Sequence, residues 1–155
     1  TTNWAPLLGW QASFKNGIRA DVNSAVTKTS NLDERQGGVV RARTTTSHDV
    51  RLTKTFLASK GIRFTWSKRR IKLPNDLNLN LTMLIARDRS QTERPGFEVL
   101  TDTDSQRLNV GSGTSYNFTP SITGGFDLAF RQTKDYKTNV IQRGITIAVN
   151  AQFRF

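Results

Sequence analysis

Apolar and polar residues alternate along most of this chain with a period of two. The last twelve residues, GITIAVNAQFRF, show the pattern most clearly, because an apolar residue occupies every second position from Ile145 to Phe155. A period of two predicts a β-strand with two unlike faces. The apolar face of such a strand has to contact a protein core, a partner or lipid.

The same alternation predicts about seven strands and no amphipathic helix. Turns or polar loops separate these strands at residues 15–17, 31–38, 58–75, 91–105, 119–123 and 133–139. The third strand, at about 39–57, is far longer than the roughly 5–6 residues usual in globular proteins, and it exceeds the about 9–11 needed to cross a membrane. Short turns that alternate with long loops are typical of transmembrane β-barrels.

The two predicted faces differ in the way that lipid and water would require. One face carries Leu, Ile, Val and Phe, and we expect Leu79, Val110, Phe126, Ile147 and Val149 to face lipid. Aromatic residues near the strand ends are expected at the membrane interfaces, namely Trp4, Phe14, Tyr116 and Phe118. The other face is expected to line a water-filled lumen through Asn80, Asn109, Ser115, Asn150 and Gln152. Because unpaired backbone is not tolerated in lipid, such strands belong to a closed barrel.

An odd number of strands raises a difficulty for a complete barrel. Bacterial single-chain barrels have even strand counts, and seven strands would close only with one parallel seam. Either one further strand lies near 62–66, or the chain is one arc of a larger barrel. The small residues of the polar face, Gly111, Gly113, Gly125 and Ala148, favour the arc, because an eight-stranded barrel fills its interior with side chains.

Charge and composition narrow the classes of partner and chemistry. The formal net charge of +11 indicates acidic partners such as nucleic acid, anionic lipid or lipopolysaccharide. The chain has no run of about 18 apolar residues that would form a membrane-spanning helix. Cysteine is absent and histidine occurs once, so Cys-based and His-rich metal sites are excluded, and we expect no metal and no cofactor.

Lys68, Arg69, Arg70 and Lys72 form the one dense basic cluster, inside an irregular connection at 58–75. Such a cluster can bind RNA, but aromatic residues that would stack on bases are not interleaved there, apart from Trp66. We therefore expect a solvated or headgroup-facing turn and no nucleic-acid partner.

The sequence indicates no enzyme. His48 stands between Ser47 and Asp49, but adjacent residues of a strand point to opposite faces and cannot form a catalytic triad. Asp102 and Asp104 lie in a predicted polar loop with no apolar pocket to shift their pKa. We expect no catalytic residues.

Three segments together resemble a known family. NDLNLNLTM after a basic stretch, then YNFTPSITGGFDLAFRQTKDYKTN, then the terminal AQFRF, are similar to the C-terminal end of the SprA (Sov) family. That family comprises the outer-membrane translocons of the type IX secretion system of Bacteroidota, which is linked to gliding motility. The resemblance covers most of the chain and is best over residues 66–155.

The resemblance implies a very large barrel of several dozen strands in the bacterial outer membrane. It would pass folded cargo proteins to the cell surface, with a lateral opening and with accessory lipoprotein and plug partners. Family chains are far longer, so residues 1–155 are expected to be a single wall segment, as a C-terminal fragment or as one subunit of a split barrel. The terminal stripe of Ile147, Val149, Phe153 and Phe155 is expected to be the signal that the barrel-assembly machinery reads.

Two other functions remain open from the residues alone. The first is a small stand-alone outer-membrane barrel that acts as a porin or adhesin. The second is a soluble basic β-protein that binds RNA, in which case the terminal stripe is an ordinary edge strand of a soluble sheet. A long exposed apolar edge would then be an aggregation hazard.

Overall fold

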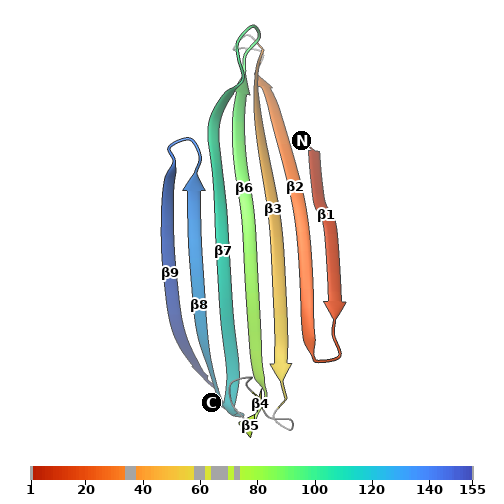
Figure 1. Cartoon of the computed structure of the whole chain (residues 1–155), viewed down its shortest axis with the longest axis vertical. Helices are drawn as coiled ribbons and strands as arrows, with labels where there is room; N and C mark the ends of the chain where they lie inside the picture. Colours follow the sequence, from red (N-terminus) through yellow and green to blue (C-terminus); the bar gives the residue numbers. More distant parts are fainter. Residues whose placement is uncertain (1, 34–37, 58–61, 64–69, 72–73, 155) are drawn as a thin grey trace.

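The chain folds into one long antiparallel β-sheet. The computed structural model describes residues 2–33, 38–57, 62–63, 70–71 and 74–154. The sheet contains seven strands in the order β1-β2-β3-β6-β7-β8-β9, so each strand lies beside its neighbours along the chain (Figure 1). Their bounds are β1 Thr2–Ser13, β2 Ile18–Asp33, β3 Val39–Phe56, β6 Leu77–Glu93, β7 Leu100–Thr119, β8 Ile122–Asp135 and β9 Val140–Phe153. The predicted seven strands are confirmed.

Two very short strands lie outside this sheet. β4 (Ile62–Arg63) pairs with β5 (Arg70–Ile71) at the end of the molecule where β3 ends and β6 begins (Figure 1). Of the further strand considered near 62–66, the structure describes only 62–63, which are extended as β4, and the rest of that segment lies outside the described residues. Lys68, Arg69, Lys72 and Trp66 lie outside the described residues.

Tight turns join the strands where the sequence carries turn chemistry. Gly17 has φ of 79°, which favours glycine, and the Ile18 amide donates to Asn16 Oδ1 at 3.2 Å, so the Asn-Gly turn forms as predicted. Between β8 and β9, the amides of Thr138 (3.0 Å) and Lys137 (2.8 Å) donate to Asp135 Oδ1. These hydrogen bonds hold the pKa of the Asp135 carboxyl below its ordinary value.

The strands extend further than the alternation predicts. The loop expected at 91–105 is wrong: β6 continues to Glu93 and β7 begins at Leu100, so the connection spans only 94–99. β2 likewise continues to Asp33, into the loop expected at 31–38. Polar residues occupy both faces of these extensions, so no period of two marks them. Backbone pairing continues because it does not depend on side-chain polarity.

Cross-strand partners form rungs that run across the whole sheet. One rung joins seven apolar residues, one from each strand: Trp10, Val22, Val50, Met83, Val110, Phe130 and Ile145. The next rung toward the β1–β2 turn joins Ala12, Ala20, Leu52, Leu81, Ser112, Leu128 and Ile147. We call the face that these rungs share the apolar face and the opposite face the polar face.

The sheet has almost no hydrophobic core of its own. Within the described residues, the buried apolar side chains are Ala20 and Val39, each 5% exposed. The accessible surface is 12017 Å², whereas a folded monomer of this mass exposes about 7,900 Å². Figure 1 shows the long strands as a single layer with two open edges, β1 and β9. Both faces of the sheet are therefore available to a partner, to lipid or to water.

Glycines allow a first test of the register. A Cβ built on Gly125 would lie 2.8 Å from the Thr114 carbonyl oxygen and 2.6 Å from Asn150 Oδ1, whereas a Cβ on Gly144 meets nothing within 4 Å. We expect Gly125→Ala to destabilise the protein by about 1–3 kcal/mol, because the neighbouring backbone cannot move away. Gly144→Ala should be neutral or slightly stabilising.

Urea unfolding of the two variants, followed by far-ultraviolet circular dichroism, measures the difference. Equal midpoints for Gly125→Ala and the wild type would show that the β7–β8 register differs from the one described.

Candidate functional site: the two faces of the sheet

A continuous apolar band covers one part of the apolar face. It lies toward the end of the sheet that carries the β1–β2 and β7–β8 turns, which we call the lower end (Figure 1). On β9 the band runs from Ile145 to Phe153, and Ile147 and Val149 are 64% and 81% exposed. These eight residue steps correspond to about 27 Å along the strand, or about 21 Å along a membrane normal at a tilt of about 40°. That height is close to the roughly 25 Å apolar band of outer-membrane barrels.

Aromatic side chains gather at the lower end of this band. Phe14 begins the β1–β2 turn, and the rings of Tyr116 and Phe118 meet edge to face at a centroid distance of 4.9 Å. A Cβ built on Gly124 would lie 2.6 Å from Phe118 Cε2, so the ring lies over that glycine. Trp4, the fourth predicted interfacial aromatic, pairs with Val26 toward the other end of β1.

Two further aromatics, one below and one above the band, were not among the predicted interfacial residues. Phe56 shares a rung with Tyr116, and the Lys54 ammonium lies 4.8 Å from the centroid of the Phe56 ring. Tyr136 lies in the β8–β9 turn at the opposite end, which we call the upper end. Its position after a polar run, TKD, gave no alternation that would assign it to a face.

Above the apolar band the same face becomes basic. Arg87 donates to Asp104 through Nε at 2.9 Å and Nη2 at 2.8 Å. The Arg87 guanidinium and the Lys134 ammonium lie 5.0 and 4.5 Å from the centroid of the Tyr136 ring, whose hydroxyl bonds Gln106 at 2.6 Å. Arg143 donates to Gln132 at 3.0 Å. The sequence did carry a signal for this basic region. Each of these cations continues the every-second-residue positions of an apolar run, so it belongs to the same face.

The predicted lumen-facing residues all lie on the polar face. The register places Asn80 opposite Gly113, Ser115 opposite Gly125, and Gly125 opposite Asn150. By the alternation of their strands, Asn109 and Gln152 belong to the same face, and the predicted lipid-facing set, Leu79, Val110, Phe126, Ile147 and Val149, belongs to the other. Their exposure to lumen or lipid stays a prediction.

Glycines let polar side chains lie along the polar face rather than stand away from it. A Cβ on Gly113 would fall 2.6 Å from both Asn80 Oδ1 and Asp127 Oδ1, so these side chains reach over the glycine from the strands on either side. Asn150 Nδ2 donates to Asp127 Oδ2 at 3.0 Å and lies over Gly125 in the same way. The result is a hydrophilic surface whose side chains lie close to the sheet, which we call the low polar wall. A shallow hollow of about 360 Å³ lies beside it.

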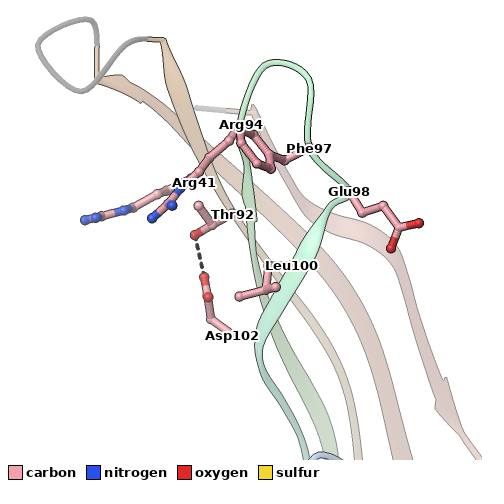
Figure 2. Close-up of a pocket in the computed structure, with 7 residues that line it drawn as sticks. All are labelled: Arg41, Thr92, Arg94, Phe97, Glu98, Leu100 and Asp102. Atoms are coloured by element: carbon pink, nitrogen blue, oxygen red, sulfur yellow. Dashed lines mark hydrogen bonds between the residues drawn. The ribbon is translucent and has the colours of Figure 1, made fainter.

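The polar face also carries charges of both signs. Arg43 donates to Asp88 through Nε at 2.9 Å and through Nη2. Near the upper end, a hollow of about 750 Å³ opens beside the β6–β7 loop. Within it the Thr92 hydroxyl donates to Asp102 Oδ2 at 2.6 Å, the dashed bond in Figure 2. Phe97 lines this hollow and is 76% exposed, while Glu98 points away from Arg41 (Figure 2).

The terminal stripe is partly described. Ile147, Val149 and Phe153 pair with Leu128, Phe126 and Ile122, all on the apolar face, whereas Phe155 lies outside the described residues. The outer edge of β9 has no partner strand among the described residues. The stripe is thus placed where a further strand could add, while its reading by the assembly machinery stays a prediction.

His48 has a neighbour that could not be foreseen from adjacent residues. Its Nδ1 lies 2.9 Å from Ser24 Oγ on the apolar face, while Ser47 and Asp49 belong to the polar face. A nucleophile and base at this distance would also need a group that orients the imidazole. In the described part of the chain no hydrogen bond to His48 Nε2 is found, and His48 is exposed.

The described residues contain no group of three His, Cys, Asp or Glu side chains placed to hold a metal ion. They also contain no helix with the length and hydropathy to cross a membrane.

No protein-family model, curated protein or solved structure matches this chain significantly.

Proposed function

We propose that this chain is one arc of a large transmembrane β-barrel, the C-terminal wall of an outer-membrane protein-translocation channel similar to the SprA family. The observation that carries the proposal is a single open sheet with an apolar band on one face, a low polar wall on the other, and almost no core. Lipid would cover the apolar band, and water would cover the polar face. The function of such an arc is passive: it forms part of a wide hydrated pore for exported proteins.

The directions of the two edge strands support an arc rather than a complete barrel. Successive strands are antiparallel, so β1 and β9 both run from the upper to the lower end. Joining them directly would create a parallel seam, which bacterial barrels do not use. An odd number of strands from elsewhere in the polypeptide, or from another subunit, gives each edge an antiparallel neighbour.

Copies of this chain do not supply that neighbour. In a ring of copies, β9 of one would pair with β1 of the next, and every seam would be parallel. A two-fold contact between two β9 edges is antiparallel, but it turns one copy upside down relative to the membrane. The small stand-alone barrel and the homo-oligomeric ring are therefore the weaker alternatives.

The low polar wall supports a wide lumen. In a narrow barrel, side chains from opposite walls fill the interior. Here Gly113 and Gly125 let Asn80, Asp127 and Asn150 lie over the strands, which leaves the space in front of the sheet free. The link to secretion, to cargo and to accessory partners rests on the resemblance of NDLNLNLTM, YNFTPSITGGFDLAFRQTKDYKTN and AQFRF.

The first prediction compares the two faces at one depth. Ile147→Arg places a charge on the apolar band and should destabilise the inserted assembly by about 2–4 kcal/mol, the cost of Arg near the bilayer midplane. Thr146→Arg is the matched control, because Thr146 is the exposed neighbour on the polar face of the same strand. Urea unfolding in lipid vesicles measures the stability of both variants. Equal losses of stability would show that the two faces are assigned wrongly.

The second prediction concerns orientation. The chain has no native cysteine, so Glu98→Cys in the β6–β7 loop and Ser121→Cys in the β7–β8 turn are single labelling sites at opposite ends of the sheet. Short turns are periplasmic in outer-membrane barrels, and the shortest connection, 120–121, lies at the lower end, whereas the upper connections are 34–38, 94–99 and 136–139. The longest connection, 57–76, also lies at the lower end, so the assignment of this end to the periplasm rests on the turn at 120–121. An impermeant maleimide should label Glu98→Cys on intact cells and Ser121→Cys only after lysis. The reverse pattern would invert the topology.

The third prediction concerns closure. Residues 1–155 alone should not refold in detergent into a heat-modifiable, protease-resistant barrel, because β1 and β9 lack antiparallel partners. The assembly that contains the remaining strands should do so. A monomeric closed barrel from this chain alone would support a small stand-alone outer-membrane barrel. A chain that stays soluble without detergent and binds RNA would support a soluble RNA-binding β-protein.

A further inference from the structure

A band of cations lies directly above the apolar band on the same face, and we call it the basic belt: Lys28, Arg87, Arg89, Lys134 and Arg143. These residues come from β2, β6, β8 and β9 and occupy the first three rungs above the rung of Trp10 and Ile145. Lys28, Arg87, Arg89 and Arg143 are exposed, and Lys134 is half-buried. The belt is therefore continuous with the proposed lipid-facing surface.

Little acid on this face offsets the belt. Among the described strand residues, the three rungs of the belt contain one acidic side chain on this face, Asp104, and Asp104 is paired with Arg87. Glu93 lies further up, on the rung of Val40. The polar face at similar height is different, because its Arg43 is bonded to Asp88. The cations on the apolar face thus have a local excess of positive charge.

Tyr136 marks the height of the belt. Its ring lies against Arg87 and Lys134, at centroid distances of 5.0 and 4.5 Å, so the ring is at the height of the belt itself. Tyrosine is enriched at the headgroup level of membrane proteins. At the lower end of the same face, the described strand residues include a single cation, Lys54, whose ammonium lies over the Phe56 ring. The two ends of the apolar band therefore differ in charge.

We infer that the basic belt binds the phosphate groups of anionic lipid in the outer leaflet. This inference rests on the proposed membrane arc, because it needs the apolar band to face lipid. Guanidinium and ammonium groups just above an apolar surface match phosphates at the head of acyl chains, by both height and charge. Nothing comparable faces the inner leaflet from the described strands, so the belt also distinguishes the two leaflets.

The test uses the full assembly with two double variants that remove equal charge. Arg89→Gln with Lys134→Gln removes two belt cations, and Arg107→Gln with Arg131→Gln removes two cations from the polar face. The probe is diphosphoryl lipid A in phosphatidylcholine nanodiscs, and lipid A retained per assembly is counted by native mass spectrometry. We expect the belt variant to bind lipid A about tenfold or more weakly, and the control variant to bind like the wild type. Raised salt should weaken the wild type in the same direction.

Two outcomes separate this inference from the proposed function. If the assembly enters nanodiscs but both variants retain lipid A like the wild type, or lose it equally, the belt is not a lipid-phosphate site and the membrane arc stands. If the assembly does not enter nanodiscs at all, the membrane arc itself is wrong. Loss of binding with phosphate-free lipid A in the wild type would confirm that the phosphates are what the belt recognises.

Discussion

Backbone hydrogen bonding between neighbouring strands is the interaction on which this whole structure depends. With Ala20 and Val39 as the buried apolar side chains, burial within the chain contributes little, and the continuous ladder from β1 to β9 keeps the strands together. A ladder of this kind leaves unpaired groups at both edges. The described sheet therefore has an open edge at β1, an open edge at β9 and an exposed apolar face, all of which the proposed barrel would cover.

The register of that ladder decides what each face can do. Because side chains alternate strictly, a slip of one residue in one strand would move its apolar residues to the polar face. The rungs instead keep seven apolar residues together, from Trp10 to Ile145. On the other face the same register brings Asn80 and Asp127 to either side of Gly113, where the missing side chain makes room for both. One alignment thus produces both a lipid-compatible band and a low hydrophilic wall.

Charge is distributed by height as well as by face. On the polar face, Arg43 and Asp88 lie side by side and neutralise each other. On the apolar face, cations are collected above the band, and Asp104 offsets only part of their charge. Since both arrangements come from strands that are far apart in sequence, the net charge of +11 by itself gave no indication of them.

The sequence by itself determined what is local: the seven strands, the Asn16-Gly17 turn and the assignment of residues to two faces, because a period of two and turn chemistry act between near neighbours. It did not determine where the strands end. β6 and β7 continue through 91–93 and 100–105 because pairing between backbones does not need alternating side chains. Nor did it place Ser24 beside His48, Phe118 over Gly124 or Arg87 on Asp104, since these contacts join residues brought together by the register of different strands. Such pairs exist only once the hydrogen-bond ladder has aligned the strands, and for that reason only the tertiary structure decided them.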